Sequence, residues 1–260
     1  MKELPPCAEE RDLWPEAGAP LLGARAYAAR RLADRRGASC SARTCCGNMS
    51  LLATKVEQMP SIISRGFRRR HRVDAPPGRV PPGQYVTSDF PVLSAGPTPR
   101  TPLDRWAFSI VGEVDEPRRW TWEEFRALPS EEVTVDIHCV TKWSKLDTAW
   151  QGVPVDTLLD GIETSAGYTV AFCDGGYTTN VPLEDLTGGK AWVAFGYGGE
   201  PLQPEHGGPA RMLVPHLYFW KSAKWVRGLR LAATDEPGFW ETNGYHNYGD
   251  PWREQRYWGD

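Results

Sequence analysis

The sequence predicts an α+β fold of mixed β-sheets with a few short helices. Glycine (26) and proline (23) are frequent among the 260 residues, which favours many turns over long helices. Short segments of alternating apolar and polar residues recur after residue 100, as is typical of half-buried strands. The sequence shows neither a βαβ rhythm nor a glycine-rich phosphate motif, so it does not favour a dinucleotide-binding parallel sheet.

The elements follow one another closely along the chain. Thr121 and Glu124 form a capping box that begins a helix, and Pro129 ends its apolar face. A second short helix is expected after Pro154, and Asp174-Gly175-Gly176 predicts a hairpin turn. Alternation predicts strands at 106–110, 133–139, 169–173, 177–181, 191–197, 211–214 and 226–233.

The chain divides into an extension and one domain. Residues 1–58 are polar and lack a repeating apolar face, so we expect a disordered N-terminal extension. Residues 59–260 are expected to form the functional domain. Its parts are a proline-rich ordered arm at 76–102, a core at about 103–235 and a tail at 236–260.

Charge and hydropathy exclude several classes of protein. The formal net charge of −3 provides no basic field for nucleic acid. No run reaches the roughly 18 apolar residues of a transmembrane helix, so we expect none. The six cysteines show no disulfide-dense spacing, and no export signal is visible, so we expect a cytoplasmic protein.

Cys139 is the residue most informative about chemistry. Alternation places it on the same face as Val133, Val135 and Ile137, at the end of a buried strand. A thiol at a strand end near a cation can serve as a soft metal ligand or as a nucleophile. Spacing alone still favours a third role, a small buried hydrophobic side chain.

Three blocks of the sequence resemble the sulfite oxidase-like molybdopterin oxidoreductases. DIHCVTKWSKLDTAWQGVPVDTLL (136–159) is similar to the cysteine motif of that family. GGPARMLVPHLYFWKSAKWVRGLRL (207–231) resembles its cofactor-phosphate segment, and PPGQYVTSDFPVLSAGPTP (81–99) resembles its N-terminal arm. The nearest branch is the bacterial soluble one, which includes the catalytic subunit of the periplasmic methionine-sulfoxide reductase.

The resemblance implies the sulfite oxidase-type molybdopterin-binding fold and one molybdenum–molybdopterin cofactor per chain. Cys139 is then the protein's thiolate ligand to molybdenum, and the cofactor supplies two more sulfurs. Lys142 is the candidate for a catalytic side chain that faces the metal or the substrate. The other candidates for cofactor binding are Thr87, Asp89, Phe90, Asp174, His206, Arg211, Lys221, Ser222, Ala223 and Lys224. His206 stands where the family has an Asn, and Asp174 stands where it has a Thr.

The same resemblance implies oxygen-atom transfer on a small oxo substrate such as an S-oxide or N-oxide. Sulfite is not expected, because Val140-Thr141-Lys142-Trp143 replaces the Asn-Arg type sequence that helps sulfite oxidases bind sulfite. The sequence shows no haem-binding domain and no dimerisation segment after residue 235, so we expect a separate electron-transfer partner and a monomer.

Two hypotheses from other classes remain open on the sequence. The first is a cofactor-free enzyme with Cys139 as its nucleophile and His138 or His216 as its base. The second is a non-catalytic member of the family that only binds the pterin or a partner protein.

Overall fold

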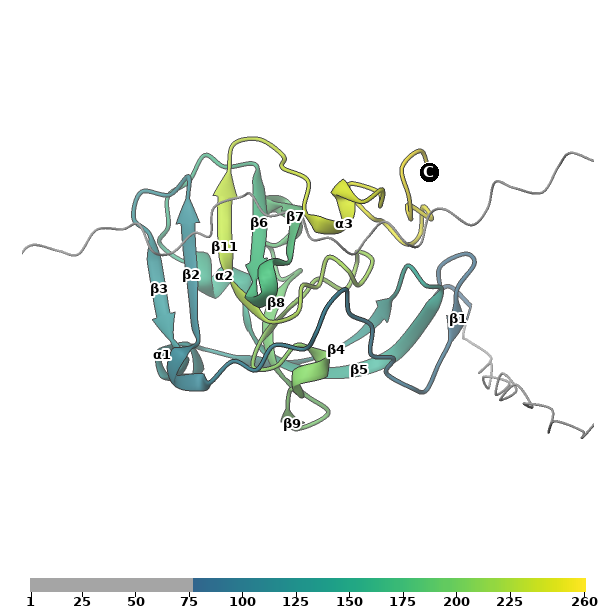
Figure 1. Ribbon diagram of the computed structural model, residues 1–260, viewed down its shortest axis with the longest axis horizontal. Coiled ribbons are helices and arrows are strands. Elements are labelled where there is room, and N and C mark those ends of the chain that lie inside the picture. Colours follow the sequence, from purple (N-terminus) through teal and green to yellow (C-terminus); the bar gives the residue numbers. More distant parts are fainter. Residues whose placement is uncertain (1–76) are drawn as a thin grey trace, which may run out of the picture. The chain divides into compact units, whose positions relative to one another are not determined.

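The computed structural model describes residues 77–260, which form two mixed β-sheets with short helices (Figure 1). One sheet has six strands in the order β1-β5-β8-β10, with β4 paired to β5 and β9 paired to β8. The other has five strands in the order β3-β2-β11-β6-β7. This arrangement confirms the predicted α+β class. The predicted extension at 1–58 and the first residues of the predicted domain lie outside the described residues.

The strands are short, apart from β4, β5 and β11. Their bounds are β1 Tyr85–Val86, β2 Ala107–Gly112, β3 Arg118–Thr121, β4 Glu131–His138, β5 Trp143–Pro154, β6 Tyr168–Cys173, β7 Thr178–Pro182, β8 Trp192–Tyr197, β9 Glu200–Pro201, β10 Arg211–Leu213 and β11 Val226–Ala232. The α-helices are α1 Trp122–Ala127, α2 Val155–Leu159 and α3 Phe239–Thr242. The 3-10 turns are η3 Leu103–Arg105, η4 Asp174–Gly176, η5 Leu183–Asp185 and η6 Pro204–His206.

The predicted helices and the predicted strands after residue 100 are present, with bounds shifted by a few residues. The capping box of α1 is formed on both sides: Glu124 N donates to Thr121 Oγ1 at 3.3 Å, and Thr121 N donates to Glu124 Oε2 at 2.8 Å. The turn between β6 and β7 is η4, in which Gly175 and Gly176 both adopt positive φ.

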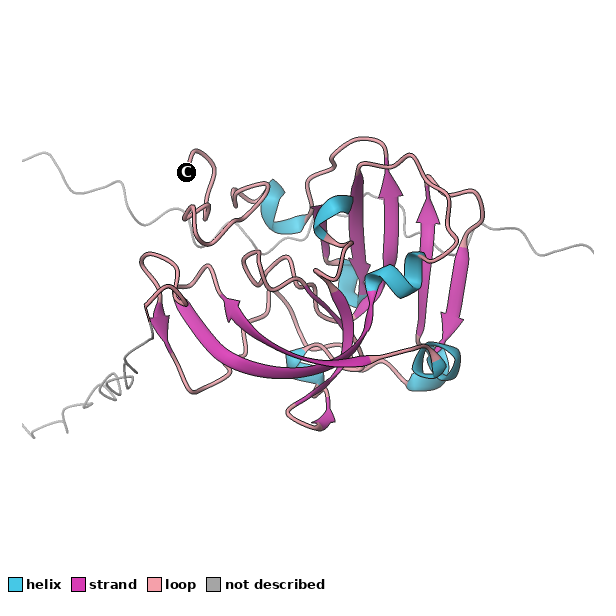
Figure 2. Cartoon of the chain, turned by 180° about the vertical axis from the view of Figure 1, so that it is seen from behind, coloured by secondary structure: helices cyan, strands magenta, loops and turns pink. Residues whose placement is uncertain are grey.

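The longest strand, β5, was not predicted. It pairs with β1, β4 and β8, so it is central to its sheet (Figure 2). Its burial does not alternate strictly, and its register to β8 shifts between Gln151 and Gly152. Gly152 also lies close to β8, because a Cβ there would be 2.9 Å from Ala194 Cα. A strand with these irregularities lacks the period of two by which strands are recognised.

The predicted alternation on β4 is wrong at its end. The register between β4 and β5 shifts between Val135 and Ile137, so the strict two-residue period is lost there. Ile137, His138 and Cys139 are all buried, whereas Val133 and Val135 are only half-buried.

Two clusters of buried apolar side chains form the core. The larger one joins the sheets, with Phe108 of β2 and Val193 and Phe195 of β8 among its members. The smaller one surrounds Cys139 and is rich in aromatic rings, including Trp143, Trp150, Tyr218, Phe219 and Trp220. Within residues 77–260, no helix has the length and apolar character needed to cross a bilayer.

Candidate active site around Cys139

A tight hairpin loop between β4 and β5 presents Cys139. Cys139 N donates to Trp143 O at 2.8 Å, and Lys142 N donates to Cys139 O at 2.9 Å. Lys142 closes the turn with a φ of 75°, the left-handed conformation usual at the end of a three-residue hairpin loop. Gln84 Nε2 donates to Cys139 O at 3.1 Å, so the arm fixes this loop from outside.

The Cys139 side chain is buried, with 7% of its surface exposed. Thr141 Oγ1 donates to Cys139 Sγ at 3.2 Å. Burial raises the pKa of the Cys139 thiol, whereas the Thr141 hydroxyl and the nearby Lys224 cation act in the opposite direction. A buried thiol of this kind becomes a thiolate most readily when a metal ion replaces its proton.

The arm brings Thr87 and Phe90 toward the hairpin. β1 runs parallel to the start of β5, and Thr87 N donates to Ser144 O at 2.9 Å. Thr87 is buried, and its Oγ1 accepts from Asp89 N at 3.1 Å, while Asp89 itself is exposed. Phe90 stacks on the His206 ring with centroids 4.0 Å apart. Segments more than 100 residues apart in sequence therefore meet beside the cysteine loop.

Arg211 is a buried cation without an acidic partner among the described residues. Only 1% of its surface is exposed, and its hydrogen bonds go to the carbonyl oxygens of His206 (2.7 Å), Ser222 (2.6 Å) and Met212 (3.3 Å). Its guanidinium carbon lies 4.0 Å from the centroid of the Phe219 ring. Burial lowers the pKa of Arg211 to about 9, as expected for a buried cation that has only carbonyl partners.

Lys224 is a second cation held by carbonyl oxygens. Its Nζ donates to Leu93 O at 2.8 Å and to Glu205 O at 2.6 Å. Gly207 brings it close to Arg211: a Cβ at Gly207 would lie 3.0 Å from Lys224 Cβ and 3.1 Å from Arg211 Cβ. Because Gly207 also has a φ of 110°, a larger residue there would be strained and would displace both cations.

The segment from Ser222 to Lys224 offers backbone donors beside these cations. Ser222 Oγ accepts from Val214 N at 2.9 Å, and Ala223 O accepts from Met212 N at 2.8 Å. Within residues 77–260, the amides of Ala223 and Lys224 have no backbone acceptor. Free amides next to two cations form a suitable place for a phosphate.

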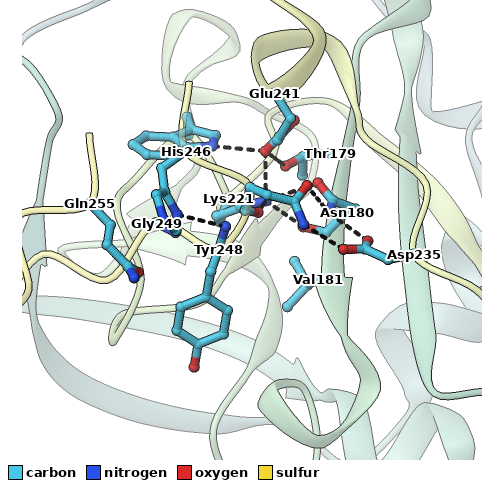
Figure 3. A network of polar contacts seen from close by, with 12 residues as sticks. Thr179, Asn180, Val181, Lys221, Asp235, Glu241, His246, Tyr248, Gly249 and Gln255 are labelled. Atoms are coloured by element: carbon cyan, nitrogen blue, oxygen red, sulfur yellow. Dashed lines mark hydrogen bonds and ion pairs between the residues drawn. The ribbon is translucent and has the colours of Figure 1, made fainter. Parts of the chain in front are cut away.

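Three of the predicted site residues lie outside this arrangement, two of them with protein partners and one exposed. The Lys221 ammonium is fully buried and bonded to Asn180, Asn247 and Glu241 (Figure 3). The Asp174 carboxylate accepts from Thr101 and pairs with Arg227 at 3.1 Å. Lys142 is exposed at the end of the hairpin loop. The structure therefore gathers Cys139, Thr87, Phe90, His206, Arg211, Ser222, Ala223 and Lys224, and gives Lys221 and Asp174 protein partners of their own.

Sequence reasoning missed Thr141, Gln84 and Gly207. Thr141 was visible as a hydroxyl two residues after the cysteine, a spacing that lets it turn back onto the sulfur. Gln84 and Gly207 act through contacts between distant segments, and only the fold reveals these contacts.

These residues fit a large anionic cofactor with a soft metal. Arg211 is an uncompensated buried cation, and His206 Nδ1 is a buried polar atom without a partner. Both are costly unless a further group lies against them. In the described part of the chain, no three His, Cys, Asp or Glu side chains gather as a metal site. Cys139 is the soft ligand that this site offers to a metal.

Comparison with known proteins shows the family to which the chain belongs. The family described as "Oxidoreductase molybdopterin binding domain" matches residues 95–240, which is more than half of the chain. The chain belongs to this family and is a molybdopterin-dependent oxidoreductase with a molybdenum cofactor. The fold is the molybdopterin-binding fold expected from the sequence blocks.

Individual relatives are similar to different extents. The chain is 47% identical over 186 residues to the uncharacterized oxidoreductase YuiH of Bacillus subtilis, covering 70% of this chain and 94% of that protein. It is 26% identical over 162 residues to the protein-methionine-sulfoxide reductase catalytic subunit MsrP of Burkholderia mallei, covering 55% of this chain and 49% of that protein. The sulfane dehydrogenase SoxCD of Paracoccus pantotrophus superposes with a TM-score of 0.48 at 23% identity, over 53% of this chain and 40% of that one.

Cofactor binding is expected to weaken as pH rises through about 8. Burial, with a further contribution from Arg211, lowers the pKa of Lys224 to about 8, while Glu205 and Cys139 oppose this. Above that pH, Lys224 no longer attracts an anion. The cofactor-free protein should show the opposite trend in stability. Its folded state binds fewer protons than the unfolded state between pH 8 and the ordinary lysine pKa of 10.5, so the Lys224 contribution to the free energy of unfolding rises there.

Pterin binding to cofactor-free protein, titrated between about pH 7 and pH 9.5, measures this effect. Lys224→Met should bind more weakly than wild type at pH 7 and should lose the dependence on pH. If pterin binding to Lys224→Met depended on pH as it does in wild type, the titrating group would be a residue other than Lys224.

Lys142→Gly tests whether Lys142 matters through its backbone conformation or through its side chain. Glycine adopts the left-handed conformation of residue 142 without strain, so the free energy of unfolding should rise by about 1 kcal/mol. If the Lys142 side chain acts on the substrate, kcat should fall at least tenfold while the molybdenum content stays unchanged. Unchanged kcat in a stabilised variant would give Lys142 a purely conformational role.

Proposed function

We propose that this chain catalyses oxygen-atom transfer on a small, uncharged oxo substrate such as an S-oxide or N-oxide. In the reducing direction, the balanced reaction of an S-oxide is R₂SO + 2 e⁻ + 2 H⁺ → R₂S + H₂O. The cofactor, when bound, supplies the two-electron redox centre that exchanges the oxygen atom. The protein binds and orients the cofactor and shapes the space in which the substrate meets it.

The apolar surroundings of Cys139 carry this proposal. The cysteine lies in a buried cluster with Trp143, Tyr218, Phe219 and Trp220. The two cations beside this cluster, Arg211 and Lys224, lie against the segment proposed to hold the cofactor. An anion such as sulfite would lose its hydration there without a dedicated counter-charge, whereas an uncharged oxide would not.

The site residues have separate proposed roles. Cys139 is the protein's ligand to molybdenum. Arg211, Lys224 and the amides of Ala223 and Lys224 bind the anionic groups of the cofactor. Trp143 Nε1 is a buried donor without a partner, and we assign it to the oxygen of the cofactor or the substrate. The proposed roles of Thr87, Phe90 and His206 are contacts along the pterin.

The electrons are proposed to come from a separate protein partner. MsrP, which the chain resembles over about half of that protein, is named a catalytic subunit, and such a name implies a further subunit. We also propose a cytoplasmic location. The cysteines of the described part are both free thiols, as is usual in a reducing compartment.

A thiol nucleophile fits this site less well. Burial raises the pKa of Cys139, and the hydrogen-bond partner of its sulfur is Thr141. The nearest histidine in sequence, His138, has its Nδ1 2.9 Å from Ser144 Oγ, and burial lowers its pKa to about 4. A base with so low a pKa activates a thiol poorly.

Substrate screening tests the proposal. The protein would be produced in a molybdopterin-competent host and assayed with reduced methyl viologen against methionine sulfoxide, dimethyl sulfoxide and trimethylamine N-oxide. Sulfite oxidation would be assayed with ferricyanide. We expect kcat/KM for at least one S- or N-oxide to exceed that for sulfite at least 100-fold. Preference for sulfite would contradict the proposal, and no turnover from fully loaded protein would favour the non-catalytic hypothesis.

A further inference from the structure

Lys221 and Glu241 form a buried ion pair outside the proposed cofactor site. Their charged atoms are 2.6 Å apart, and their side chains are 0% and 1% exposed. Glu241 Oε1 also accepts from Thr179 Oγ1 and from Trp220 Nε1, both at 2.9 Å (Figure 3). Unlike Arg211, Lys221 has its counter-charge within the protein.

The Lys221 ammonium has no donor left for a cofactor. It bonds to Asn180 O at 2.7 Å, Asn180 Oδ1 at 3.0 Å and Asn247 O at 2.7 Å, in addition to Glu241. An ammonium group has three N–H donors, and these four acceptors occupy all of them. The sequence resemblance predicted a direct cofactor contact for Lys221, whereas in the structure its ammonium group bonds to other parts of the protein.

The pair joins the start of the 222–224 segment to the tail. Lys221 directly precedes the 222–224 segment, whose amides and Lys224 side chain belong to the proposed cofactor site. Glu241 lies on α3 in the tail, and Asn247 follows it there. The tail also lies very close to its neighbours: a Cβ at Gly249 would be 2.7 Å from Trp220 Cζ2, and one at Gly238 would be 2.5 Å from Thr179 Cα.

We propose that Lys221 and Glu241 are positioning residues that tie the tail to the 222–224 segment, so that tail docking and cofactor retention are coupled. The proposal rests on the proposed cofactor role of that segment. A docked tail holds Lys221 in place and keeps the amides of Ala223 and Lys224 aimed at one anion site. By linkage, a bound cofactor holds the tail in place to the same extent.

Cofactor release from three variants separates positioning from direct binding. Lys221→Met should release the pterin about tenfold faster than wild type, and so should Glu241→Gln, which leaves the Lys221 charge intact. The double variant Lys221→Met, Glu241→Gln removes both charges and keeps an acceptor for Thr179 and Trp220. Its release rate should stay within about threefold of either single variant, because two residues that act as one unit do not have additive effects. Release is followed by pterin fluorescence after filtration, and thermal unfolding is measured on the same samples.

Other results would overturn the positioning role. If Lys221 bound the cofactor directly, Glu241→Gln would keep the wild-type release rate. Lower thermal stability with unchanged release would show a structural pair without coupling to the cofactor. Lys224→Met tests the proposed cofactor site itself. Release at the wild-type rate in that variant would show that the 222–224 segment does not hold the cofactor.

Hydrogen exchange gives a readout that is independent of any substitution. Amides of the tail between residues 236 and 247 should exchange about tenfold more slowly in loaded wild-type protein than in cofactor-free protein. The α1 amides serve as the reference, since α1 packs on β2 and β3, at the opposite edge of the five-stranded sheet from β7, which α3 contacts. Equal tail exchange in both forms would contradict the coupling.

Discussion

Cys139→Ala is expected to lower the bound molybdenum at least tenfold while the pterin content stays near that of wild type. The thiolate is the only metal ligand that we assign to the chain, so its loss removes the protein's bond to the metal. The pterin would be retained because its proposed contacts, Arg211 and the 222–224 segment, are unchanged. Turnover should fall at least 1,000-fold, since a displaced metal no longer meets the substrate in a fixed geometry.

Cys173→Ala is the matched control. Cys173 is also a buried free thiol, and burial raises its pKa as well, but it lies at the end of β6 in the other sheet. Both substitutions remove one buried sulfur, so both should lower the free energy of unfolding by a similar amount, about 1–2 kcal/mol. Metal analysis by plasma mass spectrometry and pterin fluorescence give the two contents. Full molybdenum in Cys139→Ala, or equal losses in the two variants, would contradict the assignment.

The sequence predicted those elements that carry their own local signal. Thr121 and Glu124 predicted the start of α1, because a capping box involves only residues three apart. Gly175 and Gly176 predicted the turn between β6 and β7, because this signal is also local. Strand β5 was not predicted, because the burial of its side chains does not alternate with a period of two and its register to β8 shifts. The edge strand β3 and the short helix α3 also lacked a period long enough to detect.

The site was predicted as a set of residues but not as an arrangement. Arg211 and Lys221 looked alike in the sequence, as two basic residues in one cofactor block. The fold separates them, since Arg211 has only carbonyl partners and Lys221 faces Glu241, 20 positions further along the chain. Whether a buried cation is compensated depends on residues far away in sequence, so no local pattern could have shown this difference.

Arg211→Met is expected to weaken cofactor binding about 10- to 150-fold, the range expected for losing a charge-assisted hydrogen bond of about 1.5–3 kcal/mol. Yet the cofactor-free protein should change little in stability, by no more than about 2 kcal/mol. Two effects oppose each other there. The substitution removes a buried charge that has no acidic partner, and it leaves the carbonyl oxygens of His206 and Ser222 without a donor. A cation kept in this position without a counter-charge makes sense if its counter-charge is the cofactor.

Arg227→Met provides the comparison. Arg227 is half-buried and pairs with Asp174 within the protein, so its charge is already compensated. Its loss should leave cofactor affinity within about threefold of wild type, because no proposed cofactor contact depends on it. Pterin titration of the cofactor-free variants and their chemical unfolding measure both quantities. If Arg211→Met bound the pterin as tightly as wild type, Arg211 would be a structural cation. The anionic groups of the cofactor would then have to rely on Lys224 and the free amides of its segment.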